Sequence, residues 1–449
     1  MTRYDLVVRG GEVGTGAGSH RADVAVRDGQ IVEVGPDLGG DAGRVIDATG
    51  CFVMAGAIDP HVHFNEPGRG DWEGWETGSA ALVAGGVTTC VEMPLNAHPP
   101  TLDRASFDAK VSVAAAKSRA DFALWGGLTP DNLDHLEDLA AAGVVGFKAF
   151  MSNSGMDDFH HVGDDTLYQG MRVAAALGLP VAVHAENDAI TQDLARRAQA
   201  AGRIGMRDYL ASRPVVAEVE AIGRAIALAE ATGCALHVVH VSTGAGVELV
   251  AEARVRGVDV TCETCPHYLA FVDDDAVRIG PLAKCAPPIR DADTREALWE
   301  SLLAGDIDML SSDHSPAPPD MKQSDNAFLN WGGISGCQHL VAASLTMGRE
   351  RGMGLEALGS LLARDAAHRF QLPRKGEVAP GFDADLAIWR WRDPAPVEHV
   401  RYRHPASAWD GVPMAAEPVA TVLRGMVVFG EGADERPHGR FIPGPCVEG

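Results

Sequence analysis

The chain has 449 residues, of which 46% are hydrophobic and 22% are charged, and its formal net charge is −24. This length exceeds what one hydrophobic core usually organises, so we expect one large domain and one smaller one. No apolar stretch is long enough to cross a bilayer, and the charged start, Met1 to Arg9, does not resemble a secretory signal. An acidic chain repels phosphate backbones. We therefore expect a cytoplasmic protein, with no membrane or nucleic-acid partner, that acts on a small neutral solute.

The eight cysteines lie far apart, and several, such as Cys90 and Cys234, stand within apolar runs. This distribution favours buried reduced thiols over a disulfide framework. Cys262 and Cys265 form the one CxxC pair. A structural zinc ribbon needs a second such pair, so we interpret these two as thiols at the end of a strand.

The first fifty residues indicate short strands, with 22–27 and 30–34 joined by Asp28-Gly29, a strong signal for a tight hairpin. From about residue 55, β-like apolar runs alternate with alanine-rich helical stretches, which indicates parallel strands with crossover helices. Two of the clearest helices are 131–142, closing at Gly143, and 215–231. The eight expected strands are 54–64, 87–94, 122–128, 146–152, 181–186, 236–242, 258–267 and 308–314. The pattern predicts an α/β fold, a (β/α)8 TIM barrel over 54–372.

After about residue 372 strands return, in 384–389, 420–423 and 426–429. Because chain termini commonly lie close together, we expect these strands to pair with those of the first fifty residues. The result would be a composite β-sandwich domain built from 1–53 and 373–449. The tail around Pro443-Gly444-Pro445 is expected to be loose.

Six side chains of metal-ligand types lie on five of the expected barrel strands, all but Lys148 late in their strand: His61, His63, Lys148, His184, His240 and Asp313. The carboxyl ends of barrel strands converge on one mouth, where catalytic side chains belong. Alternate residues of a strand share a face, so His61 and His63 can reach the same ion. A single histidine late in a strand is most often a buried structural residue. The coincidence over five strands favours a two-metal hydrolase.

Other histidines near these positions are harder to interpret. His237 lies three residues before His240, so strand alternation sends it to the opposite face, and we expect it to pack toward the helices. His267 and His314 end the seventh and eighth strands, and each could line the pocket or make a structural hydrogen bond.

Lys148 requires a separate argument, because an ammonium group cannot ligate a metal and would be repelled by one. A neutral amine can add carbon dioxide and become a carbamate, whose two oxygens can bridge a pair of ions. An isolated lysine at this position would simply extend its charged end toward solvent. The neighbouring ligand types favour the carbamate.

Several segments of the chain together resemble the cyclic amidohydrolases of the amidohydrolase superfamily, and within them the allantoinases. The likeness covers essentially the whole length. The segments are Asp59–Arg69, Trp72–Gly78, Gly85–Asn96, Gly146–Ser152, His184–Glu186, Lys284–Arg290, Ser312–Pro319 and Trp331–Gly336.

The resemblance implies two divalent metal ions per subunit, with zinc as the expected metal. It implies that Lys148 is an N6-carboxylysine, formed with CO2 or bicarbonate, and that the remaining ligands are His61, His63, His184, His240 and Asp313. It also implies a homo-oligomer, a homotetramer.

Substrate choice depends on fewer residues. Dihydroorotases carry an arginine two residues after the second histidine of the HxH motif, and here that position is Asn65. An amide cannot clamp a substrate carboxylate as arginine does, which favours an uncharged ring. Hydantoinases and dihydropyrimidinases show a tyrosine soon after the bridging lysine, whereas 150–155 contains none. We therefore expect allantoin as substrate, contacted by Asn96, Cys285, Ser312, Gly332, Gly333 and Ile334.

The expected reaction is hydrolysis of the hydantoin ring amide of allantoin to allantoate, a step of purine and ureide catabolism. A hydroxide held between the two metals would attack the ring carbonyl. Asp313 would take its proton and deliver it to the leaving nitrogen. The alternatives are a hydantoinase or dihydropyrimidinase acting on other neutral cyclic ureides, and a non-catalytic scaffold. The scaffold is disfavoured because all six ligand types are intact.

Overall fold

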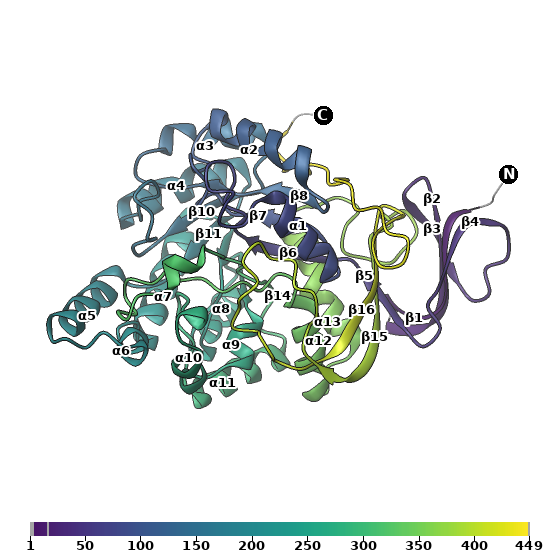
Figure 1. The fold of residues 1–449 in the computed structure, drawn as a ribbon. Helices are drawn as coiled ribbons and strands as arrows, with labels where there is room; N and C mark the ends of the chain where they lie inside the picture. The colour runs from purple at the N-terminus through teal and green to yellow at the C-terminus, as the bar shows by residue number, and fades with distance from the viewer. Residues whose placement is uncertain (1–3, 16–17, 448–449) are drawn as a thin grey trace.

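The computed structural model describes residues 4–15 and 18–447, so the first three residues of the charged N-terminal segment lie outside the described part. Figure 1 shows two parts: a barrel surrounded by helices, and a group of strands in which the start of the chain lies beside its later strands. None of the described helices has the length and apolar character needed to span a membrane.

The barrel strands are parallel and begin close to their expected positions. They are β6 (Ala57–Val62), β7 (Val87–Glu92), β8 (Asp121–Leu124) continued by β9 (Gly126–Gly127), β10 (Phe147–Phe150), β11 (Val181–His184), β12 (Leu236–Val238), β13 (Val260–Thr264) and β14 (Met309–Leu310). A parallel bridge between Val62 and His314 joins the last strand position to the first. The expected closed (β/α)8 barrel is confirmed, with strands shorter than expected. β12 and β14 end before His240 and Asp313, whereas His61, Lys148 and His184 lie within their strands.

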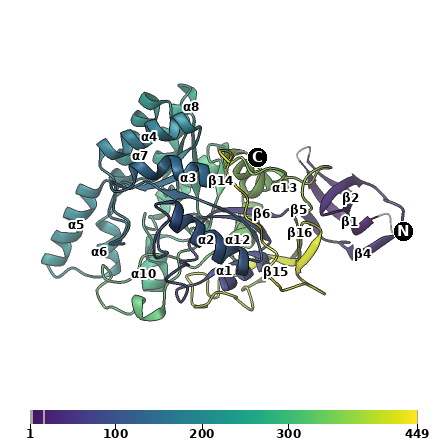
Figure 2. The ribbon, with the colours of Figure 1, turned by 90° about the horizontal axis from the view of Figure 1, so that it is seen from above.

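Helices surround this barrel (Figure 2). They are α1 (Trp75–Ala84), α2 (Arg104–Lys117), α3 (Leu136–Ala142), α4 (Asp164–Leu177), α5 (Asp188–Ala200), α6 (Met206–Ala211), α7 (Val215–Thr232), α8 (Gly244–Val255), α9 (Pro266–Ala270), α10 (Asp273–Ile279), α11 (Ala292–Ala304), α12 (Leu340–Glu350), α13 (Leu355–Gly359) and α14 (Asp365–Arg369). Short 3-10 turns cover Leu133–His135, Gly280–Ala283 and Pro319–Lys322, and a π turn covers Ser360–Arg364.

Helix α7 matches the expected range within one residue, whereas α3 begins five residues later than expected. The reason is Asn132, whose side chain accepts a hydrogen bond from the Thr129 amide at 2.9 Å and donates to the carbonyls of Leu102 and Gly127. These bonds hold the segment in a turn. The helix ends as expected, with Gly143 in the left-handed region at φ 108°.

Strand register decides which side chains point into the barrel. Lys148, Ala182, His237 and Thr261 lie opposite one another on β10 to β13. Ala182 belongs to the small hydrophobic cluster that fills the barrel, and a separate, larger cluster joins the strands to the helices. Lys148 and His237 therefore share one interior layer.

The second part is an eight-stranded sheet drawn from both ends of the chain. Its strands are β1 (Tyr4–Thr15), β2 (Gly18–Arg27), β3 (Gln30–Gly35), β4 (Ala42–Asp47), β5 (Phe52–Ala55), β15 (Leu386–Ala395), β16 (Met414–Leu423) and β17 (Met426–Phe429). β5 pairs with β1 on one side and with β15 on the other, so the tail strands join the N-terminal ones as expected. The hairpin of β2 and β3 turns at Asp28 and Gly29, both at positive φ.

One side of this sheet forms its own core, in which Leu6 and Val24 pack with Leu386 and Val422. This core is shared by strands from both ends of the chain, so the two terminal segments form a common β unit, as expected from the sequence.

The tail near Pro443 is not loose, contrary to the sequence-based expectation. The amide of Ile442 donates to the Phe122 carbonyl at 2.7 Å, and that of Gly444 donates to the Gly143 carbonyl at 2.8 Å. At Gly444 a Cβ would lie 2.2 Å from the Val144 carbonyl oxygen. The proline- and glycine-rich composition thus permits close packing against the barrel.

All eight cysteines lie in the described part of the chain and carry free thiols, and six of them are buried.

Candidate active site

Side chains of metal-ligand types meet at the carboxyl ends of the barrel strands. His61 is the next-to-last residue of β6, and His63 follows the end of that strand. His184 is the final residue of β11, and Lys148 lies within β10. His240 and Asp313 follow β12 and β14. His61, His63 and Asp313, and likewise His184 and His240, approach one another from separate strands.

His61, His63 and Asp313 form one group. The Nε2 atoms of His61 and His63 lie 3.3 Å and 3.4 Å from Oδ1 of Asp313. One ligand atom from each of the three residues lies within 4.8 Å of the others. Three donor atoms so arranged can share one metal ion.

His184 and His240 form a second group beside the first. Nδ1 of His184 lies 3.1 Å from Nε2 of His240, and the ring centroids of His61 and His240 are 5.3 Å apart. Phe150 stacks on the His184 ring with centroids 4.6 Å apart. The two groups therefore adjoin through His240.

Lys148 is fully buried, and its Nζ has no hydrogen-bond partner among the described residues. Burial lowers its pKa to about 7, although Glu263 and Asp313 act in the opposite direction. Its charge in turn contributes to the lowered pKa values of His61, His184 and His240, for which burial is the main cause. The amine therefore lies close to both groups, in surroundings that favour its neutral form.

Asp313 is held as a carboxylate. Burial alone would raise its pKa, but His61 and His63 more than offset this effect and keep the pKa at about 2. An anionic Asp313 near neutral pH can act as a proton acceptor.

Two residues of the site are bent out of strand geometry. His240 has φ 39° and Asp313 has φ 42°, a region that side-chain-bearing residues rarely adopt. β12 ends at Val238, and the left-handed backbone at His240 turns its side chain toward the site. Simple strand alternation would direct it toward the helices.

The same break in alternation makes the expectation for His237 wrong in direction. His237 is buried, but it points into the barrel, where its Nε2 lies 3.2 Å from Oε2 of Glu263 and its ring stacks on Trp125. It faces inward because it shares the interior layer of Lys148.

Two buried glutamates next to the histidines were missed by the sequence reasoning. Oε1 of Glu263 lies 2.6 Å from Nδ1 of His61, and Oε2 of Glu186 lies 2.8 Å from Nε2 of His184. Burial opposes ionisation of both carboxyls, but His61 and His237 hold the pKa of Glu263, and Arg213 and His184 that of Glu186, well below the usual range. For Glu186 the signal was its position two residues after His184 on the same strand end.

His267 and His314 differ from each other. Burial lowers the pKa of His267 to about 4, and Asp313 and His61 both act on its charge, so His267 lies near the site. His314 accepts a hydrogen bond from the Gly336 amide at 3.1 Å and lies 3.6 Å from Glu73, which indicates a structural role.

The residues expected to contact substrate have different surroundings. Asn96, at φ 68°, and Cys285 are buried, and the Cys285 thiol has its pKa raised to about 12 by burial and by Asp313. Ser312 donates its amide to Asp59 at 3.0 Å. Ile334 pairs with His314. All four are buried.

A cavity of about 550 Å³ lies beside the mouth. Its lining includes Ser152, Asn153, Tyr209, Arg213, Lys284 and Gly332. Of the expected substrate residues, Gly332 is thus the one that lines this cavity. Gly333 lies behind it, with its amide bonded to the Lys284 carbonyl and its own carbonyl accepting from Lys322 at 2.8 Å and 2.7 Å.

The donor set fits a pair of divalent metals. Histidine nitrogens and carboxylate oxygens are the ligands that zinc accepts. His61, His63, His184 and His240 each present one ring nitrogen to this cluster, and Nζ of Lys148 is a buried polar atom without a partner in the described structure. A buried polar group of this kind is unfavourable unless something binds it.

The sequence matches the pattern of the Amidohydrolase family over residues 52–428. Among curated proteins, it is 57% identical to an allantoinase of Rubrobacter xylanophilus and 49% identical to one of Deinococcus radiodurans, each over 98% of both chains.

Among solved structures, the chain is similar to an L-hydantoinase (dihydropyrimidinase) from Arthrobacter aurescens, with a TM-score of 0.95 and 38% identity over 98% of this chain and 100% of the other. A D-hydantoinase (dihydropyrimidinase) from Thermus sp. follows with a TM-score of 0.91 and 28% identity over 98% and 99% of the two chains.

Proposed function

The chain belongs to the amidohydrolase family and, within it, to the allantoinases, and from this premise we propose that it hydrolyses the ring amide of allantoin to give allantoate. It is a cyclic amide hydrolase. The observation that carries the proposal is the convergence of His61, His63 and Asp313 with His184 and His240 around the buried amine of Lys148.

We assign the metal ligands by the two groups. His61, His63 and Asp313 would hold one ion, and His184 and His240 the other. Lys148, carboxylated by CO2 or bicarbonate, would bridge them, and zinc is the metal that we expect. A bound pair of such ions polarises a carbonyl and lowers the pKa of water.

Asp313 is the proton carrier in this proposal. Its carboxylate lies between the two histidines of the first group, and its low pKa keeps it ready to accept a proton. It would take the proton of the attacking hydroxide as the C–O bond forms, and deliver it to the ring nitrogen as the C–N bond breaks. The ring then opens to a carboxylate and an amide N–H, which is the composition of allantoate.

Substrate recognition would use neutral contacts. Asn65, which replaces the arginine of dihydroorotases, is fully buried, and its Nδ2 lies 3.4 Å from the Pro316 carbonyl. We propose that polar groups of Asn96, Cys285 and Ser312 and the backbone of Gly332, Gly333 and Ile334 contact the substrate. Residues 54–372 would form the catalytic domain, and 1–53 with 373–449 the second domain. We further propose a cytoplasmic homotetramer.

A turnover assay tests the proposal. Purified protein supplied with zinc and bicarbonate is compared on allantoin, hydantoin, dihydrouracil and dihydroorotate. We expect the highest kcat/KM for allantoin. Because the solved structures are hydantoinases, the alternative is a hydantoinase, and preference for hydantoin or dihydrouracil would establish it. Preference for dihydroorotate would contradict the role given to Asn65.

A further inference from the structure

Two buried glutamates each contact one histidine of the candidate metal site: Glu263 contacts His61 and Glu186 contacts His184. We propose that Glu186 and Glu263 are positioning residues, each fixing the ring nitrogen that one histidine presents to one of the two ions. This inference rests on the proposed two-metal function and assigns to it residues that do not themselves face the ions.

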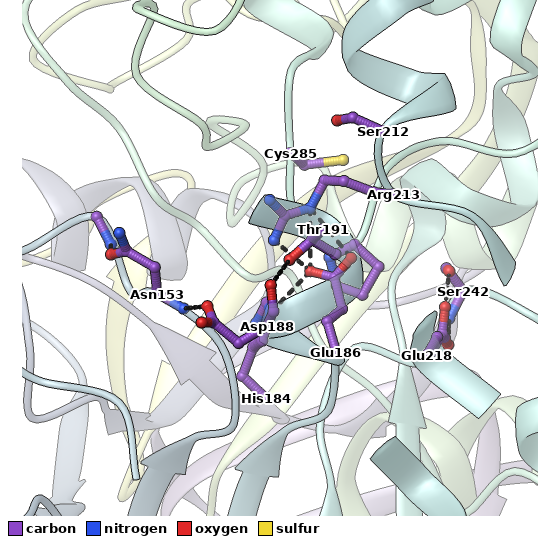
Figure 3. A network of polar contacts seen from close by, with 12 residues as sticks. Asn153, His184, Glu186, Asp188, Thr191, Ser212, Arg213, Glu218, Ser242 and Cys285 are labelled. Atoms are coloured by element: carbon purple, nitrogen blue, oxygen red, sulfur yellow. Dashed lines mark hydrogen bonds and ion pairs between the residues drawn. The ribbon is translucent and has the colours of Figure 1, made fainter. Parts of the chain in front are cut away.

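Glu186 fixes His184. Its carboxylate is fully buried, and Oε2 lies 2.8 Å from Nε2 of His184 (Figure 3). An ionised carboxylate only accepts hydrogen bonds, so Nε2 of His184 must carry the hydrogen. The lone pair of the neutral ring is then on Nδ1, the atom that lies 3.1 Å from Nε2 of His240. The ligand atom therefore faces the second group.

Arg213 keeps Glu186 in this role. Its Nε lies 3.0 Å and 3.1 Å from the two carboxylate oxygens of Glu186, and its Nη2 also donates to Oε2. Figure 3 shows the guanidinium and His184 on the same carboxylate. A forked pair of this kind fixes the plane of the carboxylate, and so the orientation of the imidazole that it holds.

Glu263 makes the equivalent contact in the first group. Its Oε1 lies 2.6 Å from Nδ1 of His61, which leaves Nε2 of His61 as the lone-pair atom, 3.3 Å from Asp313. His237 holds the other oxygen of Glu263 at 3.2 Å. His237 therefore holds the carboxylate of Glu263 in place, as Arg213 does for Glu186.

The remaining histidines lack such support. Nδ1 of His63 and Nδ1 of His240 have no hydrogen-bond partner in the described part of the chain. Each group thus contains one histidine fixed by a glutamate and one that is not. Loss of either glutamate should weaken one ion far more than the other, because ring orientation and basicity of a ligand histidine depend on its second nitrogen.

Glu218 provides a matched control. Like Glu186 it is a buried glutamate paired with an arginine, with Oε2 2.8 Å from Nη2 of Arg290, and it accepts the Ser242 amide at 2.8 Å. Figure 3 places it in the same region of the protein. It contacts none of the proposed ligand histidines, so its replacement disturbs a buried ion pair without touching a ligand.

The test measures zinc binding. Metal-free wild-type protein and the variants Glu186→Gln, Glu263→Gln and Glu218→Gln are dialysed against buffered zinc with bicarbonate, and bound metal is counted. Anomalous diffraction at limiting zinc identifies which ion is present. We expect about a 10- to 100-fold loss of affinity at the His184 ion in Glu186→Gln and at the His61 ion in Glu263→Gln. Glu218→Gln should bind both ions as the wild type does.

The outcomes separate this inference from the proposed function. Wild-type protein that fails to take up two ions would overturn the two-metal function itself. Two ions bound with unchanged affinity in both glutamine variants, or an equal loss in Glu218→Gln, would overturn the positioning roles alone. If a glutamine variant does not fold, Arg213→Met and His237→Phe replace it, since each releases one glutamate from its anchor. The same one-ion loss is expected from them, and unchanged affinities would refute the inference.

Discussion

Lys375 joins three carboxylates where the barrel meets the terminal sheet. Its Nζ lies 2.7 Å from Asp121, 2.6 Å from Asp385 and 3.1 Å from Asp383, and all four side chains are almost fully buried. Asp121 begins β8 of the barrel, and Asp385 directly precedes β15. Replacement of Lys375 by methionine keeps much of the volume of the side chain but leaves the carboxylates without this cation.

The stability lost in Lys375→Met depends on the partners that the three aspartates keep. Removing one member of a buried ion pair typically costs about 3–5 kcal/mol, because the other charge stays buried. Asp121 keeps Arg424, and Asp383 keeps Arg374 at 3.0 Å. Asp385 keeps only the Arg424 amide, at 2.8 Å, among its described partners. We therefore expect a loss at the lower end of that range, about 3 kcal/mol at pH 8.

The pH dependence has a definite sign. Burial would lower the pKa of Lys375, but Asp385 and Asp121 more than offset this effect and raise the pKa above its usual range. The contribution of Lys375 to the free energy of unfolding is therefore fully present at every pH below the usual pKa of a lysine. Burial raises the pKa of Asp385, and Lys375 opposes that rise. Without the lysine the pKa of Asp385 rises further. As the pH falls, Asp385 of the variant takes up a proton and no longer carries an unpaired buried charge. The free energy of unfolding that the variant loses relative to the wild type should therefore be smaller at pH 5 than at pH 8.

Melting temperatures of wild type and Lys375→Met, measured by calorimetry at both pH values, test this reasoning. The control is Arg207→Met, which removes an exposed pair with Asp274 at 2.7 Å and should leave the melting temperature unchanged. A variant with the melting temperature of the wild type at pH 8, or with a larger decrease in melting temperature at pH 5 than at pH 8, would contradict this reasoning.

Three further changes test the site itself. Asp313→Asn should keep the fold and most of the metal but lose about 10²–10⁴-fold in kcat, and wild-type turnover would remove Asp313 from proton transfer. Lys148→Ala should lose metal and recover activity with added short carboxylic acids, whereas two ions per chain without them would contradict the bridging role. Gly333→Ala places a Cβ 2.1 Å from the Ser315 carbonyl oxygen and should lower kcat/KM for allantoin. Gly336→Ala, whose Cβ would meet nothing closer than 3.5 Å, serves as its control, and equal effects would argue against a special role for Gly333.

The barrel could be predicted because its signals are local. Apolar runs such as 181–186 alternate with helical segments such as 215–231, and Asp28-Gly29 specifies its hairpin by backbone preference alone. The terminal sheet followed from strand patterns at both ends of the chain. The late start of α3 was harder to predict. It depends on hydrogen bonds from Asn132 to the carbonyls of Leu102 and Gly127, which only the fold brings near.

The site was predictable in its histidines and not in what supports them. Residue type and strand-end position indicated His61 and His184 as candidate ligands. The contact of His61 with Glu263 spans 202 residues, and no local pattern indicates such a pairing. The inward direction of His240 depends on its left-handed backbone, which a period-two rule cannot foresee. The same rule therefore misplaced His237.

Anomalous diffraction of zinc-loaded crystals grown with bicarbonate tests the two-metal site most directly. We expect two zinc peaks per chain, one bound by His61, His63 and Asp313 and one by His184 and His240, with density for a carboxyl group on Nζ of Lys148. A single peak, or an unmodified Lys148 with both peaks present, would contradict it.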